Sequence, residues 1–149
     1  KVAALTEIDV KCYSPLDLDN VQFVFDKSKE VIKNAQLAIV TSGTATLETA
    51  LLNTPQIVVY KTASLTYRIA KTFIKVKYIS LVNLILDKVA VKEFIQDDYT
   101  LEELYEEINT LILSSLRKKE MLDDYHKLRN ALGSKSPSKE VANYLLSDI

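Results

Sequence analysis

Glycine is the residue that this chain lacks most clearly. It has two glycines among 149 residues, where average usage would supply about ten. Gly133 follows a helical pattern and is placed to end a helix, because glycine readily adopts the left-handed conformation there. Gly43 lies instead in the small-residue segment 41–45, between the apolar runs 37–40 and 50–52. This order predicts a strand, a turn and a helix, and free amides at a helix N-terminus commonly bind phosphate.

Cysteine and histidine each occur once, as Cys12 and His126. A lone cysteine excludes a disulfide within the chain and favours a reducing compartment. One cysteine and one histidine far apart in sequence do not make a zinc site of the usual Cys/His type. A Ser-His-Asp triad would need His126, which lies in a charged helical stretch without a nucleophile motif. We therefore expect no metal ion and no triad hydrolase.

Long apolar runs and a large net charge are missing as well. No apolar run approaches the roughly 18 residues that a membrane span needs. The formal net charge of −1 gives no indication of nucleic-acid binding, and 48% hydrophobic with 26% charged residues is typical of a globular domain. The start of the chain resembles neither a signal peptide nor a natural initiator, because it begins with Lys1. We therefore expect a piece of a longer protein.

The first hundred residues alternate short apolar runs with helical patterns. Ser28 is expected as the N-cap of the first helix, while Asn53 and Pro55 should end the second. Helices are expected at 28–34, 45–52 and 64–75, strands at 2–5, 20–26, 37–40, 56–60 and 78–81, and a helical turn at 92–96. Strand–helix alternation at this spacing predicts a doubly wound α/β domain with a parallel sheet over residues 1–99.

From Thr100 onward the pattern is helical throughout. Thr100 and Glu103 form a capping box, and the apolar residues that follow keep helical spacing to residue 112. A second helix is expected over 116–132, ended by Gly133, and Ser136 with its following proline opens a third. We expect the helical segment 100–149 to pack on the α/β domain or on a partner domain.

Glu48 is the acid closest to the Gly43 turn. With Thr44 as the N-cap, Glu48 lies four residues on, on the same helix face. The first-turn amides would then bind an anion while Glu48 accepts hydrogen bonds from a diol, which suits a nucleoside diphosphate sugar. The alternative is an acid that merely complements the helix dipole. The turn is neither a P-loop nor the three-glycine dinucleotide fingerprint, since their lysine and further glycines are missing.

A stretch of 17 residues starting at Lys61 holds five basic side chains and no acid. Arg68, Lys71 and Lys75 share one helical face beside apolar residues, and such a face can rest on an anionic membrane surface. An ordinary solvated face is the alternative. The acidic block 97–107 is interpreted as a solvated face.

Asn83 and Gln96 are uncharged polar residues that the pattern places in loops beyond strand ends. Ligands of α/β proteins bind at such positions. Each residue alone is more often a turn former or a helix-end residue. The residues themselves therefore leave open whether each one binds a ligand or has only a structural role.

Three blocks of sequence, 41–52, 55–62 and 78–85, carry a resemblance to a known family. In that order and spacing they resemble lipid-A-disaccharide synthase, the peripheral-membrane glycosyltransferase of Gram-negative outer-membrane biosynthesis. The likeness continues through residues 91–96 and covers about residues 20–115. The C-terminal tail is similar only in its helical character.

The resemblance implies the C-terminal, nucleotide-sugar-binding half of a GT-B fold, in which two Rossmann-like domains face each other across a cleft. The family transfers 2,3-diacylglucosamine from UDP to 2,3-diacylglucosamine 1-phosphate, with inversion and without a metal or other cofactor. Matching motifs imply that Ser42, Gly43 and Thr44 hold the diphosphate and that Glu48 binds the ribose. They also imply that Asn83 and Gln96 lie near the UDP phosphates or the donor sugar.

The resemblance also implies that no catalytic residue lies in this chain, because the catalytic acid and much of the acceptor site belong to the N-terminal half. The chain alone should not catalyse. The expected partners are UDP-2,3-diacylglucosamine, the lipid acceptor, an anionic membrane surface and the missing N-terminal half. A homodimer is left open, no nucleic acid is expected, and the expected location is cytoplasmic, peripheral to the inner membrane.

The chain departs from the family pattern at two places. Val82 stands where the family usually has proline, which loosens the placement of Asn83, and segment 87–90 lacks the usual Gly-Arg pair. Two other functions also stay open: a GT-B UDP-sugar enzyme with a soluble acceptor, and a non-catalytic domain that kept only the fold. Retention of both Gly43 and Glu48 argues against the second.

Overall fold

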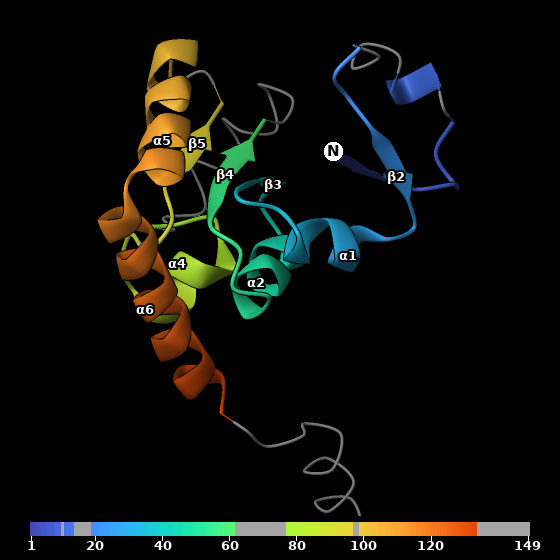
Figure 1. Cartoon of the computed structure of the whole chain (residues 1–149). Helices are drawn as coiled ribbons and strands as arrows, with labels where there is room; N and C mark the ends of the chain where they lie inside the picture. Colours follow the sequence, from blue (N-terminus) through green and yellow to red (C-terminus); the bar gives the residue numbers. More distant parts are fainter. Residues whose placement is uncertain (10, 14–18, 62–76, 97–98, 134–149) are drawn as a thin grey trace, which may run out of the picture.

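The computed structural model describes residues 1–9, 11–13, 19–61, 77–96 and 99–133 (Figure 1). The expected helix 64–75 and the helix expected from Ser136 lie outside these residues. The elements follow in this order: β1 (Val2–Ala4), β2 (Phe23–Phe25), α1 (Ser28–Lys33), β3 (Ala38–Thr41), α2 (Thr44–Leu51), β4 (Gln56–Tyr60), α4 (Leu81–Leu86), β5 (Glu93–Ile95), α5 (Leu101–Leu113) and α6 (Ser115–Leu132).

The fold class is α/β with parallel strands, as predicted, and is consistent with a Rossmann-like domain of the GT-B type. In the described part of the chain, the strands form two sheets: β1 pairs with β2, and β3, β4 and β5 pair in that order. Figure 1 shows β1 and β2 set apart from the three-stranded sheet. The carboxyl ends of β3, β4 and β5 share one edge, because all three strands run parallel.

The three-stranded sheet shares one core with the C-terminal helices. The buried side chains of this core come from β4, β5, α2, α4, α5, α6 and residues 90–91, and they include Ile57, Val58, Phe94, Leu111, Met121, Tyr125 and Leu128. Each large apolar side chain that becomes fully buried contributes roughly 1.5–3 kcal/mol. Helices α5 and α6 therefore pack against the sheet, whereas the domain boundary at residue 99 and the packing of the whole segment 100–149 stay predictions.

The ends of the long helices follow the capping predictions. Thr100 Oγ1 accepts a hydrogen bond from Glu103 N at 3.2 Å, and Glu103 Oε2 accepts one from Thr100 N at 2.7 Å, which completes the capping box of α5. Gly133, with φ of 73°, ends α6. Asn53 has φ of 60° directly after the C-cap of α2, as predicted.

The prediction of a strand at 78–81 is wrong. Ser80 is instead the N-cap of α4, because its side chain accepts a hydrogen bond from Asn83 N at 3.2 Å. Asn83 consequently lies inside α4 rather than in a loop beyond a strand end. A short apolar run does not distinguish strand from helix by periodicity, and here the serine cap begins a helix at Leu81.

The helical turn predicted at 92–96 is also wrong. Residues 93–95 form β5, paired with β4, and Phe94 is buried at 3% exposure. Two N-caps are displaced by one residue: Lys27 rather than Ser28 precedes α1, and Gly43 rather than Thr44 precedes α2. At residues 93–95, pairing with the distant strand β4 overrides the local helical propensity.

Candidate functional site

The Gly43 turn connects the end of β3 to the start of α2. Gly43 has φ of 145° and ψ of −162°, a region that essentially only glycine adopts. A Cβ atom at Gly43 would meet nothing within 4 Å. The backbone conformation and not close packing therefore requires glycine, and the space over the turn is open.

The N-terminus of α2 has no side-chain cap, because its N-cap is Gly43. Thr46 N bonds to the Gly43 carbonyl at 3.1 Å and starts the helix. Thr44 and Ala45, which carry the other first-turn amides, are exposed. An open helix N-terminus with exposed amides attracts negative charge through the helix dipole.

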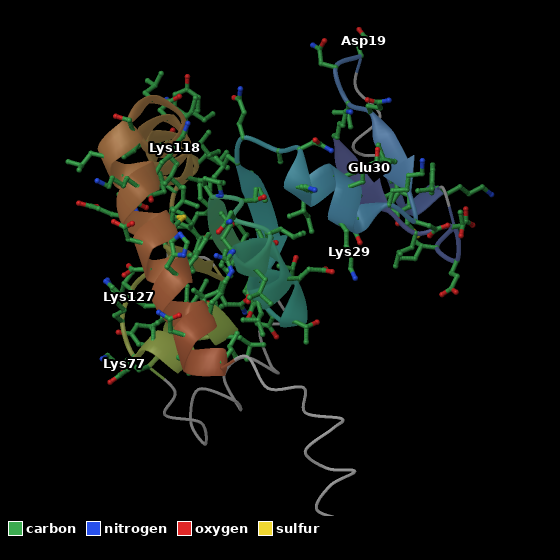
Figure 2. All side chains as sticks on the ribbon, turned by 60° about the horizontal axis from the view of Figure 1, so that its bottom comes forward. Asp19, Lys29, Glu30, Lys77, Lys118 and Lys127 are labelled. Atoms are coloured by element: carbon green, nitrogen blue, oxygen red, sulfur yellow. The ribbon has the colours of Figure 1, made fainter. Side chains whose placement is uncertain are left out.

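Glu48 lies one turn further along α2. Because Gly43 is the N-cap, Glu48 is in the second turn, and the first turn of α2 holds no acid. Thr44 and Glu48 share a face, as predicted, and both line a hollow of about 400 Å³ that Lys29 also lines. Glu48 Oε1 is 3.7 Å from Lys29 Nζ, which projects into solvent from α1 (Figure 2). An exposed ion pair of this kind contributes about 0–1 kcal/mol, so the carboxylate stays available to a ligand.

Ser42 ties the turn to a distant part of the chain. Its Oγ donates a hydrogen bond to the Ile79 carbonyl at 2.7 Å, across 37 residues of sequence. The hydroxyl proton is thus committed within the protein. An anion at this residue would have to bind the backbone amide of Ser42.

Asn83 is fully buried and its amide group is fully used within the chain. Nδ2 donates to the Val91 carbonyl at 2.8 Å and to Glu93 Oε1 at 2.7 Å, while Oδ1 accepts from the amides of Ala90 and Val91 at 2.8 and 3.0 Å. Two donors and two acceptor positions are all that an amide side chain offers. A direct ligand contact by Asn83 stays a prediction, and its bonds favour a role in holding α4 against residues 90–93.

Glu93 belongs to the same network and was not among the residues that the sequence singled out. Its carboxylate accepts hydrogen bonds from Ile79 N and Ser80 N, both at 2.9 Å, and from Asn83 Nδ2. The available signal is a carboxylate at the start of a run, 93–95, that is otherwise apolar. Through Ile79 the network brings Asn83 and Ser42 into one bonded group.

Gln96 follows β5 at the carboxyl edge of the sheet. It is 8% exposed, has φ of 56°, and its amide donates to the Tyr60 carbonyl at 2.8 Å. The register places Thr41, Val59 and Phe94 level with one another, so Gln96 and Gly43 each lie two residues beyond that level. With two strand spacings between β3 and β5, about 10 Å separates the strands that they follow. The two residues share the edge where α/β domains bind ligands.

The predicted basic face lies outside the described residues, and within those residues there is neither a candidate metal-ion cluster nor a membrane-spanning helix. Arg68, Lys71 and Lys75 fall in the part that the structure does not describe. Over the described ranges, no group of three or more His, Cys, Asp or Glu side chains could hold a metal ion. Within the same ranges no helix combines the length and apolar character that crossing a bilayer requires.

Comparison with known proteins gives a consistent result along almost the whole chain. The family profile described as Lipid-A-disaccharide synthetase matches residues 8–146. The chain is 34% identical to "Lipid-A-disaccharide synthase 1" of Legionella pneumophila over 140 residues, which cover 94% of this chain and 36% of the relative. It is 38% identical over 122 residues to the lipid-A-disaccharide synthase of Gloeothece citriformis, covering 80% of this chain and 32% of that one.

A third relative, the lipid-A-disaccharide synthase of Vibrio campbellii, is 35% identical over 125 residues, covering 84% of this chain and 32% of the relative. The chain therefore spans about a third of the length of the curated relatives that it matches.

Proposed function

Because the chain belongs to the lipid-A-disaccharide synthase family, we propose that it is the donor-binding part of a longer glycosyltransferase. The proposed reaction transfers 2,3-diacylglucosamine from UDP to 2,3-diacylglucosamine 1-phosphate. One observation carries the proposal for this chain: the exposed glycine turn at the N-terminus of α2, with Glu48 on the same helix face as Thr44.

In this proposal the diphosphate of the UDP-sugar binds at the first turn of α2. The amides from Ser42 to Ala45 and the Thr44 hydroxyl are the donors, and the helix dipole adds to them. Glu48 accepts hydrogen bonds from the ribose hydroxyls. Lys29, which lies 3.7 Å from Glu48, adds a positive charge beside the same hollow.

The same arrangement would assist the chemical step. As the glycosidic bond to UDP breaks, negative charge grows on the departing diphosphate, and preorganised amides stabilise that charge. A base must also deprotonate the acceptor hydroxyl. We assign this base to the rest of the longer protein, so the chain alone is expected to bind UDP without transferring sugar.

The membrane contact is a separate part of the proposal. Acylated substrates have to be taken from a membrane, and Arg68, Lys71 and Lys75 share one predicted basic face. We assign the protein to the cytoplasmic face of the inner membrane on this basis. Binding to vesicles of anionic lipid should weaken in the Arg68→Glu, Lys71→Glu double variant, and unchanged binding would remove this part.

The donor site is tested by calorimetric titration of the chain with UDP. We expect saturable binding that weakens about tenfold or more in Glu48→Ala, because the diol then loses its acceptor. Glu106→Ala removes an exposed carboxylate from α5 and serves as the matched control, with unchanged affinity expected. Equal affinities of wild type and Glu48→Ala would exclude the ribose role of Glu48. Absence of binding at millimolar UDP would contradict a donor site in this chain.

A further inference from the structure

The Glu93 carboxylate holds the backbone directly before α4. It accepts one hydrogen bond through Oε2, from Ile79 N at 2.9 Å, and two through Oε1, from Ser80 N at 2.9 Å and Asn83 Nδ2 at 2.7 Å. Bonds to an ionised acceptor are stronger than bonds between neutral groups. Ser80 and Asn83 are fully buried, so water does not compete for these donors. Residues 79 and 80 are thereby fixed relative to β5.

The other side of this segment bonds to the Gly43 turn. The carbonyl of Ile79 accepts a hydrogen bond from Ser42 Oγ at 2.7 Å, and Ser42 directly precedes Gly43. A continuous hydrogen-bonded path therefore runs from Glu93 in β5, through the backbone of residues 79–80, to the turn after β3. In this path Ser42 and Glu93 are connected through the backbone of Ile79 and Ser80, which bonds to both side chains.

We infer that Glu93 is a positioning residue of the nucleotide site, acting on the Gly43 turn through Ile79 and Ser42. This inference rests on the proposed function, because that turn is where the diphosphate would bind. The geometry of the turn matters for affinity, since its amides must converge on one anion. Glu93 itself binds no ligand in this account.

Glu93→Gln is the informative substitution because it keeps the size of the side chain. An amide has one acceptor atom, whereas the carboxylate receives backbone amides on both oxygens. One backbone N–H would therefore face an NH₂ group instead of an acceptor. The segment at residues 79–80 loses part of its restraint, and the Ser42 hydroxyl loses a fixed partner.

The test is a double-mutant cycle on the 149-residue chain with UDP as the probe. Glu93→Gln and Ser42→Ala should each weaken UDP binding about tenfold. The double variant should bind no more weakly than the weaker single variant, because both substitutions break the same path. Wild-type affinity in Glu93→Gln would overturn the inference. A double variant weakened about a hundredfold would overturn it too, because independent effects multiply.

Glu107→Gln provides the matched control. Glu107 is another largely buried carboxylate, with 12% side-chain exposure. It pairs at 3.5 Å with Lys92, the residue that precedes Glu93 in the sequence. It belongs to α5 and lies outside the path, so unchanged UDP affinity is expected. An equal loss of affinity in Glu107→Gln would show that general destabilisation explains the effect and would overturn positioning. If the wild-type chain does not bind UDP at all, the proposed function itself fails, and this inference with it.

A second measurement covers the case in which Glu93→Gln does not fold. Amide NMR of the wild-type chain should show the Ile79 and Ser80 resonances moving with UDP, in step with Gly43. In Ser42→Ala the movement at residues 79 and 80 should be lost while that of Gly43 remains. Resonances of Ile79 and Ser80 that do not respond in the wild type would overturn the inference.

Discussion

Replacing Gly43 by alanine examines the most constrained position of the proposed site. The residue has φ of 145° and ψ of −162°, and holding a non-glycine residue in such a region costs about 1–3 kcal/mol. No atom lies within 4 Å of a Cβ placed there, so steric overlap adds nothing to this cost. The whole effect of Gly43→Ala is therefore a backbone effect.

The strain acts on either stability or affinity. If the variant keeps the turn, unfolding 149 residues with about 2.1 cal/mol/K per residue gives a decrease in Tm of about 3–10 °C. If the free variant relaxes the turn, UDP has to restore it, and 1–3 kcal/mol then weakens binding about 5- to 150-fold. Thermal unfolding and UDP titration on the same samples separate the two cases.

Gly133→Ala is the matched control. Gly133 has φ of 73° and ψ of 171°, and a Cβ there would also meet nothing within 4 Å. It should lose similar stability, but its UDP affinity should stay unchanged because it ends α6. Wild-type stability together with wild-type UDP affinity in Gly43→Ala would refute the reasoning.

Three further substitutions test the surroundings of the site. Asn83→Ala should lower the free energy of unfolding by at least about 3 kcal/mol in urea titrations, because the buried backbone amides of Ala90 and Val91 lose their acceptor. Unchanged stability together with lost UDP binding would indicate instead that Asn83 contacts UDP directly. Arg129→Ala should lower the stability measured by thermal unfolding by about 1–3 kcal/mol, because Arg129 Nη2 donates to the last carbonyls of α2, with 2.9 Å to Leu51 O. An unaltered Tm would refute this capping role. Burial raises the pKa of Asp124, but hydrogen bonds from Lys88 and Lys127 outweigh it and hold the pKa below its ordinary value. The stability from this lowered pKa is present above about pH 4 and lost as pH falls further, so Asp124→Asn should differ most from wild type near neutral pH; a pH-independent difference would contradict this.

Features with a local cause could be predicted from the sequence. The rarity of glycine located the Gly43 turn, and the capping box at Thr100 located the start of α5. Asn53 and Gly133 mark helix ends because each residue tolerates positive φ. The Thr44–Glu48 spacing placed both side chains on one face of α2. Each of these depends on residues within one or two turns of one another.

Features that depend on distant partners could not be predicted in the same way. Residues 93–95 form a strand because β4 lies beside them, and the backbone amides of Ile79 and Ser80 are held by the Glu93 carboxylate. The ligand contact that the family resemblance implies for Asn83 stays a prediction, whereas the bonds of its side chain to Ala90, Val91 and Glu93 appear only in the structure. The role of Glu93 depends on three donors that lie 10 to 14 residues away in the sequence. No pattern in a single sequence shows such bonds.

The central claim is that UDP binds at the turn between β3 and α2, and amide NMR of the chain titrated with UDP tests it most directly. The account predicts shifts that cluster at residues 42–48, saturate with UDP, and weaken in Glu48→Ala. A cluster of shifts elsewhere, for example at the hollow lined by Ile39 and Ile112, would contradict it. So would an unchanged spectrum at millimolar UDP.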